Sequence, residues 1–408
     1  MPAANVSLFN IHLLGIVANV VWSTFLQSWL RALSFRRSIK KKKKEREKKK
    51  IMTNMVGQSP QNGKGAGRTL IIGSNGFIGR FITEACLLSG RSTYLLNRCR
   101  SSSLISKAPI TKSFQDMGAT IVYGSIKDQD LLEKVIRENK IEFVISAVGG
   151  EGIMDQIPLI RAIKAVGTVK RFLPSEFGHD IDRSDPVEPG LTMYKEKRQV
   201  RRFVEETGIP YTYICCNSVA AWPYYNNTHP ADVHPPLDEI QIYGDGTVKA
   251  YFVAGSDIGK FTMKAMDDDR TLNKTVHFRP PKNLLNMNEL ASLWEDTIGS
   301  RLPRVTVTED DLLDAAKEMR IPESIVAAFT HEIFIKRCQI NFSMDKPTDI
   351  DVCSLYPDLP FRPLDECFKD FLTKIVGTPK IVTSTKPVGS NNGIMVPSVK
   401  EGALIMTA

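Results

Sequence analysis

The chain has 408 residues, enough for roughly two or three domains, and its 42% hydrophobic and 24% charged residues are typical of a globular protein with a sizeable core. The net charge of +9 is local, because Arg31–Lys50 holds 12 Lys or Arg against 2 Glu while Met1–Leu30 has no charged side chain. The rest of the chain is therefore close to neutral, which excludes a nucleic-acid-binding face over the body of the protein.

The N-terminal segment, residues 1–67, is expected to lie outside the fold as an apolar and basic extension with a linker. Val6–Leu30 is largely apolar but is interrupted by Asn, His and Gln, and the basic block follows it. One interpretation is a membrane anchor whose basic flank stays in the cytosol. The other, which we favour, is an extension upstream of a start at Met52 or Met55. A membrane is then a partner only if residues 1–51 belong to the working protein.

The predicted fold begins with the stretch Arg68–Arg80. An apolar and β-branched run at Thr69–Ile72 predicts a buried strand, three glycines follow, and Phe81–Leu88 has helical spacing of apolar residues. Strand, glycine turn and helix together predict a dinucleotide-binding turn, although a plain strand-to-helix turn without a ligand is the alternative. The residues expected to contact the cofactor here are Gly73, Ser74, Asn75, Gly76, Phe77, Ile78 and Gly79.

The next predicted strand, Ser92–Asn97, decides which cofactor is expected. In a dinucleotide fold an acidic residue at the end of this strand binds the ribose of NAD, but here Arg98 occupies that position and Lys107 lies nearby. A guanidinium binds a 2′-phosphate, which a carboxylate would repel. We therefore expect NADPH rather than NADH, with a solvated basic loop as the alternative.

Strands and helices alternate after this point. The pattern predicts strands at 120–123, 142–147 and 171–173 and helices at 129–139 and 155–166. Such alternation is typical of an α/β protein with a doubly wound parallel sheet, the NAD(P)-binding Rossmann fold, here over residues 68–215. Its ligand is expected at the carboxyl ends of the strands, which adds Val148, Gly149 and Gly150 to the cofactor site.

The second half of the chain is less regular. Residues 216–376 are expected to form mainly a smaller mixed α/β lobe that binds the substrate, and residues 377–408 a disordered tail. Gln241–Tyr243 and Val248–Val253 are predicted to form a β-hairpin. Helices are predicted at 257–266, 287–299, 310–319 and 322–337.

The seven cysteines show neither zinc-ligand nor Cys-x-x-Cys spacing, so neither disulfides nor a metal site is expected. Free thiols favour a reducing compartment, and we expect a cytoplasmic protein.

The residues after the fifth strand are the candidates for chemistry. Short-chain dehydrogenases place a Tyr-x-x-x-Lys pair on the helix predicted here, but Tyr194 is followed at +4 by Arg198. Another acid–base group is needed, and a lysine that loses solvation in a cleft can exchange protons near neutral pH. Lys197 and His179 are the candidates. A solvated helix lysine and a loop histidine bonded to Asp180 are the alternatives.

Three stretches carry a resemblance to a known family: the glycine turn with Arg98, Arg-Phe-Leu-Pro-Ser-Glu-Phe-Gly at 171–178, and the Glu-Pro-Gly segment that leads to Lys197. Over about 68–376 the chain resembles the plant isoflavone reductase-like family of atypical, NmrA-like short-chain dehydrogenases. Ile-Cys-Cys-Asn at 214–217 and Thr-His-Glu at 330–332 are similar to the members that reduce flavan-3,4-diols.

The resemblance implies an NADPH-dependent reductase that converts flavan-3,4-diols such as leucocyanidin to flavan-3-ols such as catechin, with Lys197 and His179 as its catalytic residues. In the family's proposed route, loss of a phenol proton expels the C4 hydroxyl, and the resulting quinone methide is reduced at C4. We expect Tyr194, Asn217 and Ser218 to contact this small-molecule substrate.

Two alternatives stay open. One is another enzyme of the family, acting on an isoflavone, on pinoresinol or lariciresinol, or on a phenylcoumaran. The other is a non-catalytic NADP(H)-sensing protein, which the presence of both His179 and Lys197 disfavours. Lys195 places a second amine near the site, and stereochemistry and oligomeric state stay open.

Overall fold

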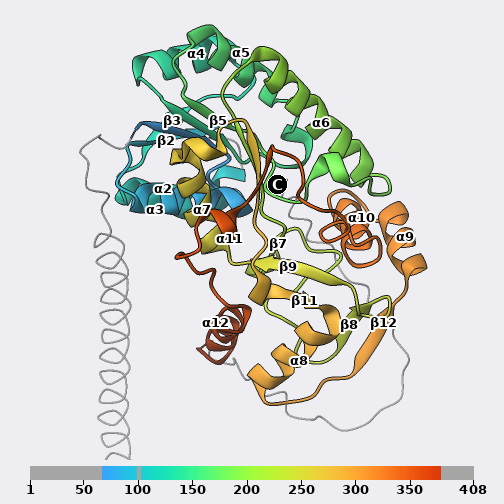
Figure 1. The fold of residues 1–408 in the computed structure, drawn as a ribbon. Coiled ribbons are helices and arrows are strands. Elements are labelled where there is room, and N and C mark those ends of the chain that lie inside the picture. The colour runs from blue at the N-terminus through green and yellow to red at the C-terminus, as the bar shows by residue number, and fades with distance from the viewer. Residues whose placement is uncertain (1–66, 99–102, 378–408) are drawn as a thin grey trace, which may run out of the picture. The chain divides into compact units, whose positions relative to one another are not determined.

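Figure 1 shows the computed structural model of the chain, which describes residues 67–98 and 103–377. The predicted N-terminal extension and C-terminal tail therefore lie outside the described residues, except at their inner ends. Lys107 lies in a helix that the structure describes, but its side chain is not among the described ones. Within the described ranges, no helix has both the length and the apolar character needed to cross a bilayer.

A parallel sheet forms the first layer of the fold. Five of its strands lie in the order β3-β2-β1-β4-β5, three more follow in the order β6-β10-β13, and a parallel bridge between Phe172 and Tyr211 joins the two groups. All pairings within both groups are parallel. The strands are β1 (Thr69–Ile72), β2 (Thr93–Asn97), β3 (Thr120–Tyr123), β4 (Phe143–Ser146), β5 (Arg171–Leu173), β6 (Thr212–Cys215), β10 (Lys274–His277) and β13 (Asp349–Asp351).

Helices cover both faces of this sheet, which confirms the predicted doubly wound architecture (Figure 1). α4, α5 and α6 lie on one face, and α2, α3 and α7 lie on the other. The central strands are buried on both sides and therefore consist of apolar and β-branched residues. The helices are α2 (Phe77–Leu88), α3 (Ser103–Asp116), α4 (Gln129–Glu138), α5 (Gln156–Val166), α6 (Gly190–Thr207) and α7 (Gly255–Asp267).

The second lobe contains two small sheets, one with the order β11-β9-β7 and one that pairs β12 with β8 in parallel. The predicted hairpin is wrong, because β8 and β9 belong to different sheets: β9 pairs with β11 antiparallel and with β7 parallel. The strands are β7 (Ser218–Val219), β8 (Ile240–Tyr243), β9 (Lys249–Val253), β11 (Leu284–Asn286) and β12 (Arg304–Val307). The helices are α8 (Met287–Ile298), α9 (Glu309–Glu318), α10 (Glu323–Phe334) and α12 (Leu364–Gly377), whereas the short helix α11 (Val352–Leu355) follows β13 and packs in the core of the large sheet.

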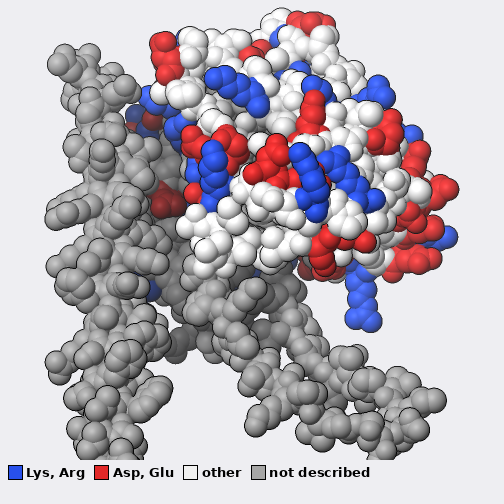
Figure 2. All heavy atoms as spheres, turned by 90° about the horizontal axis from the view of Figure 1, so that it is seen from below, with Lys and Arg blue, Asp and Glu red and all other residues white. Residues whose placement is uncertain are grey.

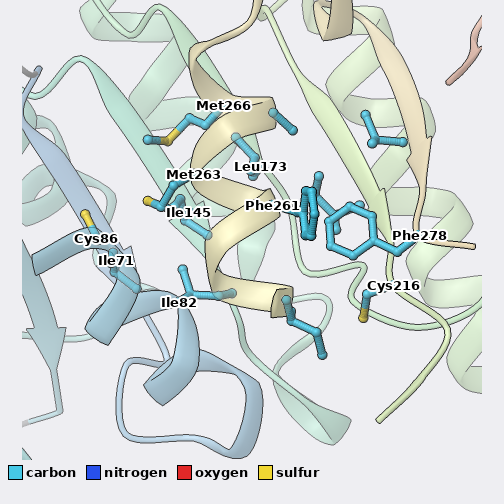
Figure 3. Packing of buried hydrophobic residues seen from close by; sticks show 14 of the residues in the cluster. Ile71, Ile82, Cys86, Ile145, Leu173, Cys216, Phe261, Met263, Met266 and Phe278 are labelled. Atoms are coloured by element: carbon cyan, nitrogen blue, oxygen red, sulfur yellow. The ribbon is translucent and has the colours of Figure 1, made fainter. Parts of the chain in front are cut away.

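The chain beyond residue 215 contributes to both lobes. α7, β10 and β13 return to the large sheet, and α7 packs against α2 at very short range. A Cβ at Gly259 would lie 2.3 Å from the carbonyl oxygen of Phe81, so only glycine permits this approach. Figure 3 shows the core beneath α7, where Phe261 and Phe278 lie side by side with ring centroids 5.9 Å apart.

The surface of the described part carries charges of both signs. Figure 2 shows acidic and basic side chains on the same face with uncharged surface between them. This face therefore offers no extended basic surface for a nucleic acid.

Candidate active site

The turn after β1 brings the start of α2 into close contact with the strand end. Gly73 has φ +80°, and a Cβ there would lie 2.4 Å from the carbonyl oxygen of Ala147, at the end of β4. A Cβ at Gly79 would lie 1.9 Å from the carbonyl oxygen of Gly73. Glycine is therefore required at both positions, and the first turn of α2 sits directly over the end of β1.

This geometry fits a dinucleotide. The first turn of α2 contains no acidic residue. Its N-cap residue is Gly76, which has no side chain to accept a hydrogen bond from the N–H groups at the start of the helix. A helix N-terminus with free N–H groups attracts an anion such as a pyrophosphate. Because β1 and β4 are neighbours, Val148, Gly149 and Gly150 follow the strand next to the glycine turn, at the point where the strand order reverses.

A polar network supports the glycine turn from β2. The Ser74 hydroxyl donates to Oδ1 of Asn97 at 3.3 Å, and Nδ2 of Asn75 donates to the Thr111 hydroxyl at 2.8 Å. Arg98 follows Asn97 directly and is exposed. The structure therefore places the predicted 2′-phosphate residue beside the turn, with its side chain open to solvent.

One face of α6 carries the groups predicted for chemistry. Tyr194, Lys197 and Arg201 recur at three- and four-residue spacing and are all buried, so they lie on the face that packs inward. Lys195, two residues before Lys197, is exposed and lies 3.9 Å from Glu188. The structure therefore separates the two amines and leaves Lys197 alone at the site.

His179 follows β5 and contacts α6. Its Nδ1 lies 2.7 Å from the hydroxyl of Tyr194, and Phe329 of α10 packs against both rings, with centroids at 6.1 and 5.0 Å. The predicted alternative of a bond to Asp180 is not what the structure shows. Burial, followed by the positive charge of Lys197, lowers the pKa of His179 to about 4. The imidazole is therefore neutral near pH 7, and Nε2 is the ring nitrogen left for a ligand.

Lys197 is held from the same segment. Its Nζ donates to the backbone carbonyl of Glu176 at 2.8 Å. Burial lowers the pKa of Lys197, although the negative charge of Glu176 acts in the opposite direction. Burial likewise raises the pKa of Tyr194 well above its usual range, so the phenol keeps its proton. Burial thus loosens the proton of Lys197 and tightens that of Tyr194, while the imidazole of His179 is already neutral.

These side chains line a cavity of ≈ 270 Å³ between the segment after β5, α6, the loop after β7 and α10. His179, Tyr194, Lys197 and Ser218 all line it, as do Pro223 and Tyr224 of the loop after β7. Asn217 does not: its Nδ2 donates to the carbonyl of Phe278 at 2.9 Å, away from the lining.

The sequence-based prediction missed the part of the lining that α10 supplies. The helix was predicted, but its role in the cavity was not. The apolar residues at 326, 329 and 333 recur at helical spacing, and this stripe is the signal that marks a buried face. The lining residues of α10 are Val326, Phe329, Thr330, Ile333 and Phe334.

A second buried cluster, Asp180, Cys215 and His277, has ligand atoms within 4.8 Å of one another. Asp180 already accepts from Arg201 at 2.9 Å and pairs with Arg183 at 3.0 Å. Two guanidinium groups at one carboxylate disfavour a divalent cation, so this cluster is better described as an ion-pair network.

Fold and site together define an NAD(P)-binding protein of the Rossmann type with a cavity beside the sheet that a buried histidine and a buried lysine line. A model of the NmrA-like family matches residues 66–368, and the chain belongs to this family.

Three relatives show where the chain lies among known proteins. It is 61% identical over 308 residues to leucoanthocyanidin reductase of Desmodium uncinatum, covering 76% of this chain and 80% of that one. It is 43% identical over 308 residues to phenylcoumaran benzylic ether reductase IRL1 of Ginkgo biloba, covering 76% of this chain and all of that one. The structure of the binary complex of leucoanthocyanidin reductase with NADPH from Vitis vinifera is similar with a TM-score of 0.72 and 63% identity, over 75% of this chain and 100% of that one.

Proposed function

We propose that the protein is an NADPH-dependent reductase that converts flavan-3,4-diols such as leucocyanidin to flavan-3-ols such as catechin. The observation that carries the proposal is the cavity, where a neutral histidine and a desolvated lysine line a largely apolar space next to the segment that follows β5 of the large sheet. The similarity to the reductases of D. uncinatum and V. vinifera supports this substrate class over the other reductases of the family.

The residues at the strand ends fit the cofactor. We expect Gly73–Gly79 to hold the pyrophosphate, Val148–Gly150 to lie against the nicotinamide half, and Arg98 with Lys107 to bind the 2′-phosphate. A Cβ would not fit at Gly73 or Gly79, so the turn is tight there. This tight turn supports the first of these assignments. When bound, NADPH supplies the hydride that ends on C4 of the substrate.

Side chains of the protein itself can transfer the protons that the reaction requires. A benzylic hydroxyl is a poor leaving group. Removal of a phenol proton pushes electron density toward C4 and so assists departure of the C4 hydroxyl. In the tautomer whose Nδ1–H donates to the Tyr194 hydroxyl, neutral His179 accepts a proton at Nε2, and Lys197 carries a proton that burial makes easier to release. General acid–base assistance of this kind is worth roughly 10²–10⁴-fold in rate.

The apolar part of the lining supports the same chemistry. Phe177, Met193 and Phe329 line the cavity together with the two polar groups, so a bound flavan would displace water there, and Tyr194 and Tyr224 add aromatic rings to the lining. Excluding water strengthens the electrostatic effect of each polar group on the substrate. The six described cysteines are all unpaired, which supports the expectation of a reducing, cytoplasmic location.

Incubation of the purified protein with leucocyanidin and NADPH tests the proposal, with catechin measured by chromatography and NADPH by absorbance. Parallel reactions contain pinoresinol, an isoflavone or a phenylcoumaran. We expect catechin to form in step with NADPH consumption. Turnover of another substrate without catechin would assign a different reductase, and cofactor binding with no consumption would indicate a sensor.

A further inference from the structure

The loop after β7, residues 220–239, contacts two parts of the molecule that lie far apart in the sequence. Four of its residues line the cavity: Pro223, Tyr224, Asn227 and Pro230. Further along the loop, the two carboxylate oxygens of Asp232 accept from the two terminal nitrogens of Arg80, at 2.6 and 3.3 Å. Arg80 lies in α2 directly after the glycine turn. One loop therefore joins the wall of the cavity to the helix that follows the glycine turn.

Aromatic rings surround the same ion pair. The guanidinium carbon of Arg80 lies 5.2 Å from the ring centroid of Phe77 and 5.0 Å from that of Phe81. The ring of Phe77 also packs edge-to-face against His229 of the loop, with centroids 5.5 Å apart. Because a guanidinium is attracted to aromatic faces, Arg80 is held against α2 while its donors bind Asp232.

The middle of the loop lies between two buried anchors. Before it, the hydroxyl of Tyr243 donates to the carbonyl of Pro223 at 2.6 Å. After it, the indole N–H of Trp294 donates to the carbonyl of Pro236 at 2.6 Å. Residues 226–234 between these anchors are half-buried or exposed, so this stretch has less buried surface to keep it in place. The contact with α2 falls within this stretch.

We infer that Arg80 is a positioning residue for the substrate, because its ion pair with Asp232 holds the middle of the loop closed against the cavity. This inference rests on the proposed function, which places a flavan in the cavity. A ligand binds more weakly when the conformation that accepts it is only partly populated. Loss of the ion pair lets the loop open more often, and the affinity of the cavity for its ligand falls.

Neutralising either partner tests this role. Calorimetric titration with catechin at saturating NADP⁺ measures the affinity, and steady-state kinetics with leucocyanidin measure KM and kcat. We expect Asp232→Asn and Arg80→Met to bind catechin roughly two- to fivefold more weakly and to raise KM by a similar factor, as for an ion pair that solvent reaches. The kcat should stay unchanged, because the bonds that hold Lys197 and His179 do not involve the loop.

Salt gives an independent measurement. The side chains of Arg80 and Asp232 are 27% and 44% exposed, so dissolved ions screen their attraction. Catechin is uncharged near neutral pH, so salt has little direct effect on its own binding. The difference in catechin affinity between the wild type and Asp232→Asn should therefore shrink when sodium chloride is raised to about 1 M.

Two further variants separate positioning from general damage. The double variant of Arg80→Met with Asp232→Asn should bind catechin no more weakly than Arg80→Met alone, because the two side chains act as one pair. Asp116→Asn removes an exposed ion pair with Lys112 inside α3 and should bind catechin as the wild type does.

If Arg80→Met fails to fold, Asp232→Asn still decides the question, since it changes the more exposed partner. Catechin affinity in Asp232→Asn equal to that of the wild type at low salt would overturn the inference, and so would a loss that high salt leaves unchanged. Catechin formation by the wild type would in either case keep the proposed function. No catechin formation from leucocyanidin by the wild type would overturn both.

Discussion

Arg201 holds both carboxylate oxygens of Glu176, at 3.0 Å each, where neither side chain is more than 2% exposed. Arg201 lies on α6 one turn beyond Lys197, and the backbone carbonyl of Glu176 is the acceptor for Lys197. The same guanidinium reaches Asp180, next to His179. A single buried ion-pair network therefore fixes the positions of both proposed catalytic residues.

Removing the charge of Arg201 is expected to destabilise the protein strongly. Arg201→Met leaves Glu176 and Asp180 buried beside less positive charge, and breaking a buried pair in this way costs roughly 3–5 kcal/mol. Urea denaturation followed by circular dichroism measures the free energy of unfolding. Arg202→Met is the matched control, since the Arg202 side chain is 52% exposed and its ion pairs are worth at most about 1 kcal/mol. Equal losses in the two variants would contradict a special role for the buried network.

Replacing Lys197 tests the acid–base assignment. Lys197→Ala is expected to lower kcat for leucocyanidin by roughly 10²–10⁴-fold, because proton transfer at the substrate loses its partner. Lys195→Ala is expected to leave kcat unchanged, since Lys195 is exposed and outside the lining. Steady-state kinetics with NADPH measure both. A rate in Lys197→Ala close to that of the wild type would remove Lys197 from the mechanism.

Local patterns in the sequence were sufficient for the parallel sheet and its glycine turn. The run at 69–72, the three glycines and the apolar spacing after them form one pattern that can be read within the stretch 69–88 of the sequence, and the structure contains each of these features. All four predicted helices of the second half also appear, within a few residues at their ends. Arg98 was placed correctly at the end of β2 because strand length fixes that position.

Features that depend on distant contacts were not predictable in this way. β8 has the alternation of a hairpin strand, but its partner is β12, some 60 residues further on. The hydrogen bond from the buried Gln339 to Ser218 has no local signal, because the two residues are 121 positions apart in the sequence. The cavity wall supplied by α10 was likewise hidden, since an apolar stripe predicts a buried face without indicating what it faces.

Stability is expected to depend on pH through His179. The pKa of His179 falls from 6.5 to about 4 on folding, so between these values the unfolded chain binds a proton that the folded protein does not. The contribution of His179 to the free energy of unfolding should therefore decrease as pH falls from 6.5 to about 4 and level off below that. The contribution of this residue is about 3 kcal/mol over the whole window.

Urea denaturation at several pH values between these limits measures the slope. His179→Gln, which cannot titrate, is expected to have a shallower dependence than the wild type. His234→Gln is the control, because His234 is exposed and its replacement should leave the slope intact. An unchanged slope in His179→Gln would show that other groups carry the pH dependence.

Cofactor preference is expected to depend on Arg98. Its guanidinium follows β2 directly and is exposed, so a bond to the 2′-phosphate would be charge-assisted but partly screened by water. Arg98→Ala is expected to raise the KM for NADPH about tenfold, at the low end for a hydrogen bond to a charged group. The KM for NADH should change little, because NADH has no phosphate at this position.

In Arg98→Asp the carboxylate would also repel the 2′-phosphate, and the preference should shift toward NADH. Initial rates with each cofactor at saturating leucocyanidin give the KM values for both variants. If the KM values for NADPH and NADH changed by the same factor, Arg98 would not bind the 2′-phosphate.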